Sequence, residues 1–142
     1  MIDSVVVATD GSESVERAVD VALDLARHFD AEVHALYVVD ADEVEASPDR
    51  LRQDLEAALG EQAEDALAAV ADRADREVVT AVRTGRPAAE ITAYAREQDV
   101  DVVVTGTRGR HGENRFLVGS VAEGVVRSCP RPVLTVRQLP AD

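Results

Sequence analysis

Short apolar runs alternate with segments of helical periodicity along the whole chain, and this alternation restricts the fold more than any other feature. Between the runs, apolar residues recur every three or four positions, as from Val15 to Phe29, and fall on one helical face. Strands that alternate with helices predict an α/β domain with a mainly parallel sheet covered on both faces. The runs with the length and composition of strands are residues 4–8, 33–39, 78–84, 101–105 and 133–136.

The longest helical segment follows an expected acidic loop at residues 40–42. Ser47 and Pro48 suit a helix start. Gly85 to Pro87 predicts the turn into the next helix. With these elements we expect one domain over residues 1–142. The positions expected to form one buried stripe along the long helix are Leu51, Leu55, Ala58, Leu59, Ala66, Leu67 and Val70.

Three glycines stand at fixed intervals between the strand at 101–105 and the last helix. Gly106 is followed after two residues by Gly109, and after nine more by Gly119 and Ser120. Glycine allows positive φ and lets an anion approach the peptide N–H groups without meeting a Cβ. The start of the helix offers further free N–H groups and a positive dipole end. The spacing therefore predicts a phosphate-binding loop.

A purely structural interpretation of the same residues stays open. Ser120 and Glu123 have the spacing of a capping box, which stabilises a helix start and needs no ligand. The upstream glycines favour phosphate binding, because capping does not require them. Asp10 has two interpretations of equal weight, as a cap of the first helix or as a ligand residue.

In an open parallel sheet the ligand crevice lies where the strand order reverses, outside the carboxyl ends of the strands. We expect the first and fourth strands to meet there. Their carboxyl ends carry Asp10-Gly11-Ser12 and Gly106 to Gly109, so two turn-rich segments are predicted to converge on one crevice.

These segments resemble the universal stress protein family over nearly the whole chain. The resemblance implies a single doubly wound, open parallel five-stranded sheet of order 3-2-1-4-5, Rossmann-like and of the adenine nucleotide alpha hydrolase-like type. In that family the intact glycine spacing marks the branch that binds ATP, so ATP with Mg²⁺ is the implied ligand. The residues that carry the resemblance are Ala8 to Ser12, Gly106 to Gly109, Gly119 to Glu123 and Pro132 to Val136.

The resemblance also implies roles for individual residues. Asp10 would lie near the ribose and the metal-bound phosphates, and the main chain of Val38 would face the adenine. Family members form homodimers through the last strand, which would place Val133, Leu134 and Val136 at the interface. One of Arg108, Arg110 and Arg115 is expected to offset phosphate charge. The residues expected around the phosphates are Gly106, Arg108, Gly109, Gly119, Ser120 and Val121.

Charge excludes several function classes. The chain has 28 acidic and 15 basic residues, with a formal net charge of −13, which argues against nucleic-acid binding. All the basic residues are arginine, and without lysine a Walker A ATPase is excluded. This balance is typical of a halophilic, acidic protein, whose thermal midpoint should be higher in molar KCl than in dilute buffer.

We expect a cytoplasmic nucleotide-dependent module of the stress response that signals to an unknown protein partner. No apolar run approaches the roughly 18 residues of a membrane span, and the first residues lack the basic segment of a signal peptide. No catalytic residue is predicted. Two alternatives stay open, a slow ATPase or self-phosphorylating enzyme, and a binder of another nucleotide such as FMN.

Overall fold

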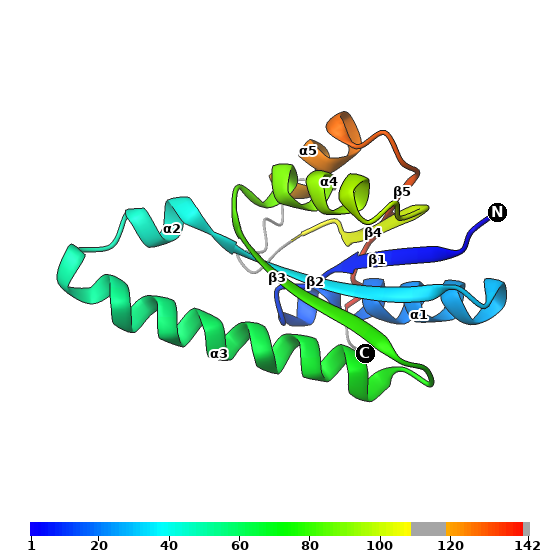
Figure 1. Ribbon diagram of the computed structural model, residues 1–142, viewed down its shortest axis with the longest axis horizontal. Helices are drawn as coiled ribbons and strands as arrows, with labels where there is room; N and C mark the ends of the chain where they lie inside the picture. Colours follow the sequence, from blue (N-terminus) through cyan, green and yellow to red (C-terminus); the bar gives the residue numbers. More distant parts are fainter. Residues whose placement is uncertain (109–118, 141–142) are drawn as a thin grey trace.

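Five parallel strands form one sheet in the order β3-β2-β1-β4-β5. The computed structural model describes residues 1–108 and 119–140 (Figure 1). Both the parallel sheet and its order confirm the fold expected from the sequence. The strands are β1 (Ser4–Ala8), β2 (Glu32–Asp40), β3 (Val78–Gly85), β4 (Val102–Gly106) and β5 (Val133–Val136).

Helices cover both faces of this sheet. Figure 1 shows α1 and α3 on one face, and α4 and α5 on the other. In the part of the chain that the structure describes, no helix is both long and apolar enough to cross a membrane. The helices are the 3-10 helix η1 (Glu13–Val15), α1 (Glu16–Phe29), α2 (Ala41–Glu45), α3 (Asp49–Arg73), α4 (Pro87–Glu97) and α5 (Ser120–Ser128).

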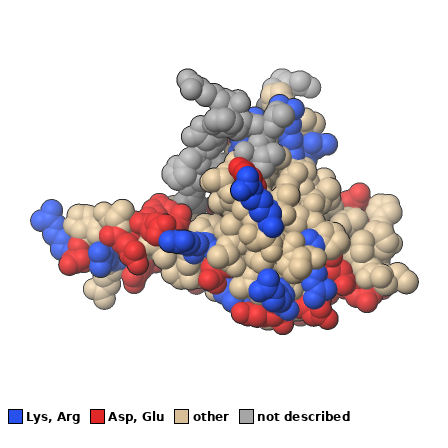
Figure 2. Space-filling view, turned by 90° about the horizontal axis from the view of Figure 1, so that it is seen from above, with Lys and Arg blue, Asp and Glu red and all other residues tan. Residues whose placement is uncertain are grey.

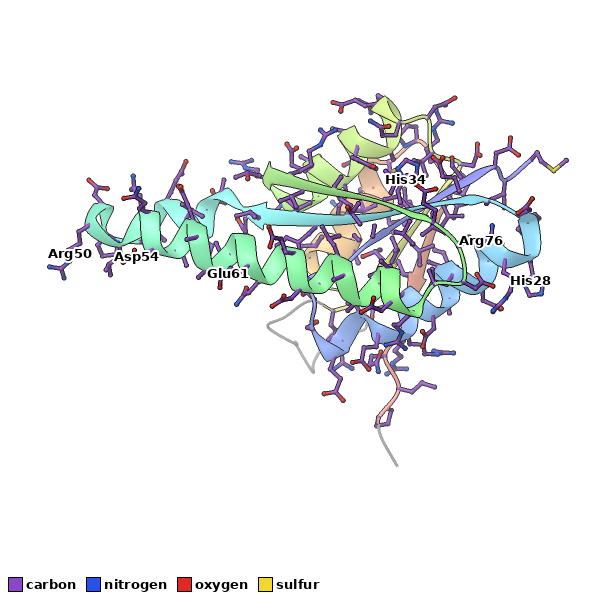
Figure 3. The ribbon with its side chains drawn as sticks, turned by 60° about the horizontal axis from the view of Figure 1, so that its bottom comes forward. His28, His34, Arg50, Asp54, Glu61 and Arg76 are labelled. Carbon is purple, nitrogen blue, oxygen red and sulfur yellow. The ribbon has the colours of Figure 1, made fainter. Side chains whose placement is uncertain are left out.

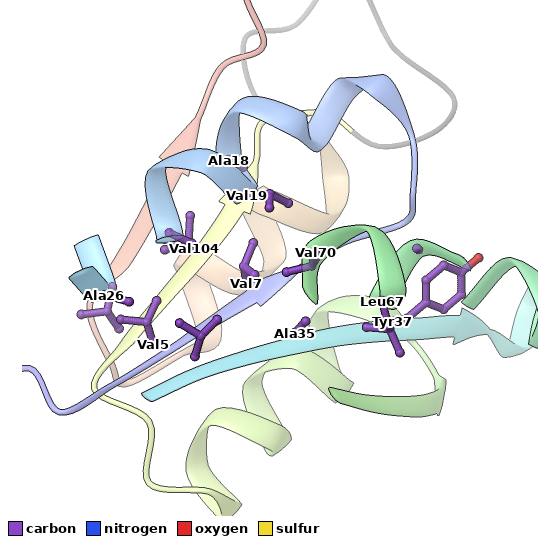
Figure 4. Close-up of a cluster of buried hydrophobic side chains, with 14 of the residues drawn as sticks. Val5, Val7, Ala18, Val19, Ala26, Ala35, Tyr37, Leu67, Val70 and Val104 are labelled. Atoms are coloured by element: carbon purple, nitrogen blue, oxygen red, sulfur yellow. The ribbon is translucent and has the colours of Figure 1, made fainter. Parts of the chain in front are cut away.

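Two hydrophobic cores lie on the two faces of the sheet. In the first, Val5, Val7 and Val104 contact α1, while Tyr37 packs beside Leu67 of α3 (Figure 4). The second lies under α4 and α5 and includes Val6, Leu36, Val103, Ile91 and Val125. Because β1 and β4 are buried on both faces, their sequences read as continuous runs of valine rather than as an alternation.

The N-terminal half of α3 departs from the expected buried stripe. The side chain of Leu51 is 47% exposed and Ala58 is also exposed. Burial on this helix begins at Leu59. This half extends beyond the edge of the sheet in Figure 1, so its apolar positions have no sheet beneath them. Arg50 and Asp54 project into solvent from the same half (Figure 3).

A short helix, α2, replaces the acidic loop expected at residues 40–42. The side chain of Asp40 accepts a hydrogen bond of 3.0 Å from the main-chain N–H of Asp42 and so caps this helix. The next helix, α3, begins at Asp49 with Pro48 as its N-cap, one residue later than Ser47 and Pro48 suggested. Both differences lie in or next to an acidic segment. Aspartate favours turns and helix caps alike, so composition does not distinguish a loop from a short capped helix there.

Charged side chains of both signs mix at the end of the molecule formed by α2 and the start of α3 (Figure 2). Arg52 and Asp49 form a pair of 3.1 Å there, and both side chains are largely exposed. Exposed pairs of this kind contribute less than about 1 kcal/mol each. The carboxylates therefore act mainly through the net charge of the surface.

Candidate functional site

The turn after β1 is closed by its own side chains. The carboxylate of Asp10 accepts hydrogen bonds from the N–H and the hydroxyl of Ser12, at 2.9 and 2.6 Å. The hydroxyl of Thr9 accepts one of 3.1 Å from the N–H of Gly11. Asp10 thus forms an Asx turn with the residue two positions on, and the N-cap of α1 is Val15, which makes no side-chain capping bond. The prediction that Asp10 caps the first helix is wrong.

The loop after β4 begins beside this turn, because β1 and β4 are paired neighbours in the sheet. A Cβ added to Gly106 would lie 3.1 Å from a methyl carbon of Val15 and 3.3 Å from the carbonyl oxygen of Ser14. The two segments expected to converge on one crevice therefore touch each other directly. Residues 109–118 lie outside the described part of the chain, so the expectations for Gly109, Arg110 and Arg115 fall outside it as well.

The glycines in this region serve two different needs. Among the described glycines, Gly11 has a positive φ of 77°, whereas Gly119 has a φ of −76°. The expectation that Gly106 supplies a positive φ is therefore wrong. Gly106 and Gly119 are needed for space: a Cβ on Gly119 would lie 3.0 Å from the carbonyl oxygen of Thr107. That same oxygen accepts a hydrogen bond from the N–H of Gly119.

The start of α5 is not a capping box. Gly119 is the N-cap, without a side-chain capping bond, and Ser120 is the first residue of the helix. Glu123 instead pairs with Arg127 across one turn, at 2.9 Å. The first N–H groups of a helix have no partner within the helix, so those of Ser120 and Val121 are donors that α5 itself does not use.

The end of β2 turns its main chain toward the same crevice. The N–H of Thr9 donates 2.9 Å to the carbonyl of Leu36, and the β1–β2 ladder ends at the pair of Ala8 and Leu36. Main-chain groups alternate in direction along a strand, so those of Val38 point to the same side as those of Leu36. Beyond Ala8 the chain leaves the sheet, and the polar edge of Val38 faces the space that opens there.

A cleft of about 240 Å³ occupies this space. Its apolar lining includes Leu36, Val38, Ile91 and Ala122, and the end of β4 and the start of α5 line it with the polar residues Thr105, Thr107, Arg108 and Ser120. Every described residue expected at the ligand lines this cleft, with Gly109 outside the described part. These residues are Asp10, Val38, Gly106, Arg108, Gly119, Ser120 and Val121.

The cleft also holds two carboxylates that the sequence did not single out, Asp40 and Glu43. They reach it because α2 begins where the sequence indicated a loop. With Asp10, they give the described part of the lining three acidic residues and one arginine, Arg108. In the described part of the chain no group of three or more His, Cys, Asp or Glu side chains is arranged to hold a metal ion. A divalent cation would therefore need further oxygen ligands from the molecule it accompanies.

A buried histidine packs on the α4 face of the sheet, outside the cleft. His34 is buried, with its ring nitrogens 2.6 Å from the hydroxyl of Tyr94 and 2.6 Å from a carboxylate oxygen of Glu32 (Figure 3). Burial raises the pKa of Tyr94. None of these three residues lines the cleft, so His34 is a core histidine with its hydrogen bonds satisfied.

The outer strand β5 presents one large apolar side chain to solvent. Leu134 is 39% exposed, whereas Val136 packs in the first core and Val133 packs partly against the second. Of the three residues expected at a homodimer interface, Leu134 has an exposed side chain. The side chain of Val136 is buried, so this residue could contact a partner only through its main chain.

The fold and the cleft define a doubly wound α/β protein with a ligand cleft at its topological switch point. The profile of the universal stress protein family matches residues 1–137. The universal stress protein MJ0531 of Methanocaldococcus jannaschii is 37% identical over 138 residues, covering 94% of this chain and 81% of that protein. The chain belongs to the universal stress protein family.

Solved structures agree with this assignment. Hypothetical protein MJ0577 superposes with a TM-score of 0.87 at 26% identity, covering 99% of both chains. A universal stress protein in complex with cAMP has a TM-score of 0.72 at 25% identity, covering 97% of this chain and 98% of the other. The universal stress protein from Archaeoglobus fulgidus in complex with dAMP has a TM-score of 0.64 at 25% identity, covering 96% of this chain and 98% of the other. Some structural neighbours therefore bind nucleotides.

Proposed function

We propose that the cleft binds ATP with Mg²⁺ and that the protein is a cytoplasmic, nucleotide-dependent module of the stress response. The observation that carries the proposal is the cleft itself, which combines an apolar lining with polar residues from the end of β4 and the start of α5 at the switch point of the sheet. Neighbours of the same fold in complex with cAMP and with dAMP support an adenine nucleotide as the ligand.

The apolar and polar residues of the cleft suit the two ends of such a nucleotide. The base would lie against Leu36 and Ile91, with the main chain of Val38 hydrogen-bonding its edge. The phosphates would lie at the polar residues. There Arg108 supplies a positive charge, and the first N–H groups of α5 supply donors. Gly106 and Gly119 leave the main chain without side-chain bulk at this point.

Charge balance favours a metal-bound nucleotide over the free anion. Three carboxylates line the cleft, and a bare triphosphate beside them would be repelled. Mg²⁺ is commonly held by one or two carboxylates together with the phosphates of its nucleotide. We propose Asp10 as the protein's contribution, because it lines the cleft next to Gly106 and Arg108 along the paired ends of β1 and β4.

The proposal is tested by thermal unfolding with and without Mg-ATP, at a fixed KCl concentration. Ligand at 100 times its dissociation constant should stabilise the protein by about 2.7 kcal/mol. In Asp10→Asn the remaining side-chain oxygen still accepts from Ser12, so the fold should hold while the Mg²⁺-dependent part of the shift is lost. Asp54→Asn on the exposed face of α3 is the matched control for the same change of charge.

Mass spectrometry of protein purified without denaturation identifies any nucleotide that it carries. If Mg-ATP gives no thermal shift but FMN or GTP does, the ligand is that nucleotide and not ATP. If Asp10→Asn keeps the full Mg²⁺-dependent thermal shift, Asp10 does not hold the metal, and the proposal that the cleft binds the nucleotide still stands. Release of phosphate above background would add slow hydrolysis to the binding function.

We also propose a homodimer through the edge of β5. The exposed side chain of Leu134 lies on this outer strand, whose far edge pairs with no other strand of the described sheet. Leu134→Arg should shift the protein to monomers in sedimentation analysis, because two like charges would meet across the two-fold axis. Unchanged mass in this variant would exclude β5 as the interface.

A further inference from the structure

A second hollow lies next to the cleft and shares Thr107 and Arg108 with it. Its volume is about 630 Å³, compared with about 240 Å³ for the cleft. Residues of η1 and of the C-terminal tail after β5 build the rest of its wall. The described residues that line it are Glu13, Ser14, Thr107, Arg108, Arg137, Gln138, Leu139 and Pro140.

Long-range hydrogen bonds fix the tail that forms this wall. The guanidinium of Arg17 donates 2.9 Å to the carbonyl of Arg137, and the main-chain N–H of Arg17 donates 3.0 Å to the side-chain oxygen of Gln138. Val15, the N-cap of α1, provides no side-chain capping bond, so Gln138 caps this helix from a distant part of the chain. The tail is therefore held in place before any ligand binds.

The hollow is basic within an acidic protein. Arg108 and Arg137 line it together with one carboxylate, that of Glu13, whereas the whole chain has a net charge of −13. Seven other arginines pair with carboxylates, but within residues 1–108 and 119–140 Arg137 has no ion pair. The paired arginines are Arg27, Arg52, Arg73, Arg76, Arg83, Arg127 and Arg131.

The lining also carries neutral hydrogen-bond donors. Ser14 and Thr107 have hydroxyl groups. Because the side-chain oxygen of Gln138 accepts from α1, its amide NH₂ is left to donate elsewhere. Guanidinium groups with hydroxyl and amide donors are the usual partners of phosphate oxygens.

We propose that this hollow is a second anion subsite that binds a polyphosphate group. Since Arg108 lines both spaces, a chain of phosphates that begins in the cleft would meet the hollow at Arg108. The polyphosphate is either the distal part of a nucleotide with a long phosphate chain or free inorganic polyphosphate. The first form rests on the proposed nucleotide function, and the second does not.

Calorimetric titration at one fixed KCl concentration tests the subsite with AMP, ATP, adenosine tetraphosphate and inorganic tripolyphosphate. The test variant is Arg137→Gln, which keeps the carbonyl that Arg17 binds and so leaves the tail anchored. Arg50→Gln is the matched control, because Arg50 is exposed on α3 and far from both spaces. Losing a charge-assisted hydrogen bond should weaken polyphosphate binding about tenfold, with AMP affinity unchanged and no loss in Arg50→Gln.

The probes separate the two sources. Free polyphosphate is the ligand if tripolyphosphate binds by itself, does not compete with AMP and loses affinity in Arg137→Gln. An advantage of adenosine tetraphosphate over ATP that disappears in Arg137→Gln identifies the distal nucleotide phosphates. Equal affinities of wild type and Arg137→Gln for all four probes overturn the subsite, while ATP binding in that experiment leaves the proposed function standing. If tripolyphosphate binds in an Arg137-dependent manner but ATP does not bind, the subsite stands and the proposed ATP-binding function falls. If none of the four probes binds, both proposals are overturned.

Discussion

Two turns frame the cleft at the switch point of the sheet, and they are held in different ways. The turn after β1 is closed by hydrogen bonds between residues two positions apart, from Gly11 to Thr9 and from Ser12 to Asp10. The loop after β4 is instead fixed at its start by contacts with other segments. Gly106 packs against η1, and Thr107 donates to the carbonyl of Val136 at 3.1 Å.

The difference shows that glycine meets different requirements in the two turns, although an added Cβ at Gly11 would also come within 3.0 Å of Ala66. Gly11 is needed for its backbone conformation, which side chains other than glycine rarely adopt. Gly106 is needed because the neighbouring turn comes too close for a Cβ. A conformational requirement is local, whereas a requirement for space depends on how distant segments pack.

The largest effect is expected at the local turn. Gly11→Ala places a side chain at a φ of 77° and brings its Cβ to 3.0 Å from that of Ala66 on α3. Strain and overpacking together should lower the free energy of unfolding by about 2–4 kcal/mol. The measurement is urea unfolding of the apo protein at a fixed salt concentration.

Gly60→Ala is the control for this substitution. Gly60 lies inside α3, and an added Cβ there meets nothing within 4 Å. Its replacement should raise stability by about 1 kcal/mol through helix propensity alone. If Gly11→Ala were as stable as wild type, the local turn would not depend on a positive φ.

A smaller effect is expected at the loop after β4. Gly106→Ala should cost about 1–2 kcal/mol by overpacking, because Val15 and Ser14 must move by a few tenths of an ångström. The shifted η1 should also weaken nucleotide binding. Since the clash is with Ser14 and Val15, which closely follow Gly11 in the chain, the double variant with Gly11→Ala should depart from additivity by at least about 0.5 kcal/mol. Strict additivity would mean that the turns are independent.

The smallest effect concerns the opposite end of β1, where a carboxylate again binds main-chain N–H groups. The N–H of Asp3, at 2.8 Å, holds the pKa of the Asp101 carboxyl below its usual value, and the N–H of Ser4 adds to this. The stabilisation is therefore complete above the unfolded-state pKa of about 3.9 and is lost as the pH falls through the lower folded-state pKa.

Asp101→Asn should accordingly be less stable than wild type at about pH 7, and the difference should disappear toward about pH 2. Thermal unfolding across this range measures it. A difference that stays constant with pH would assign the effect to hydrogen-bond geometry and not to charge. This anchor joins residues nearly a hundred positions apart, unlike the Asx turn of Asp10.

The sequence predicted the fold and most of the cleft, and its errors have two separate physical causes. Period and composition located all the strands, and the turn residues located Asp10 and Gly106. The same period predicted burial at Leu51, which is 47% exposed, because periodicity does not say where the sheet beneath a helix ends. Glu43 was missed because a short helix has too few residues to show a period.

By itself, the sequence determined the local features: the alternation of strands and helices, the valine runs of a sheet buried on both faces, and the conformation of the Asp10-Gly11-Ser12 turn. These depend on residues within a few positions of one another. Tertiary structure alone decided that Gly106 must make room for η1, that Gln138 caps α1, and that Arg108 is shared by two hollows. Such contacts join segments far apart in the chain, and only the packing of the whole domain sets the distances between them.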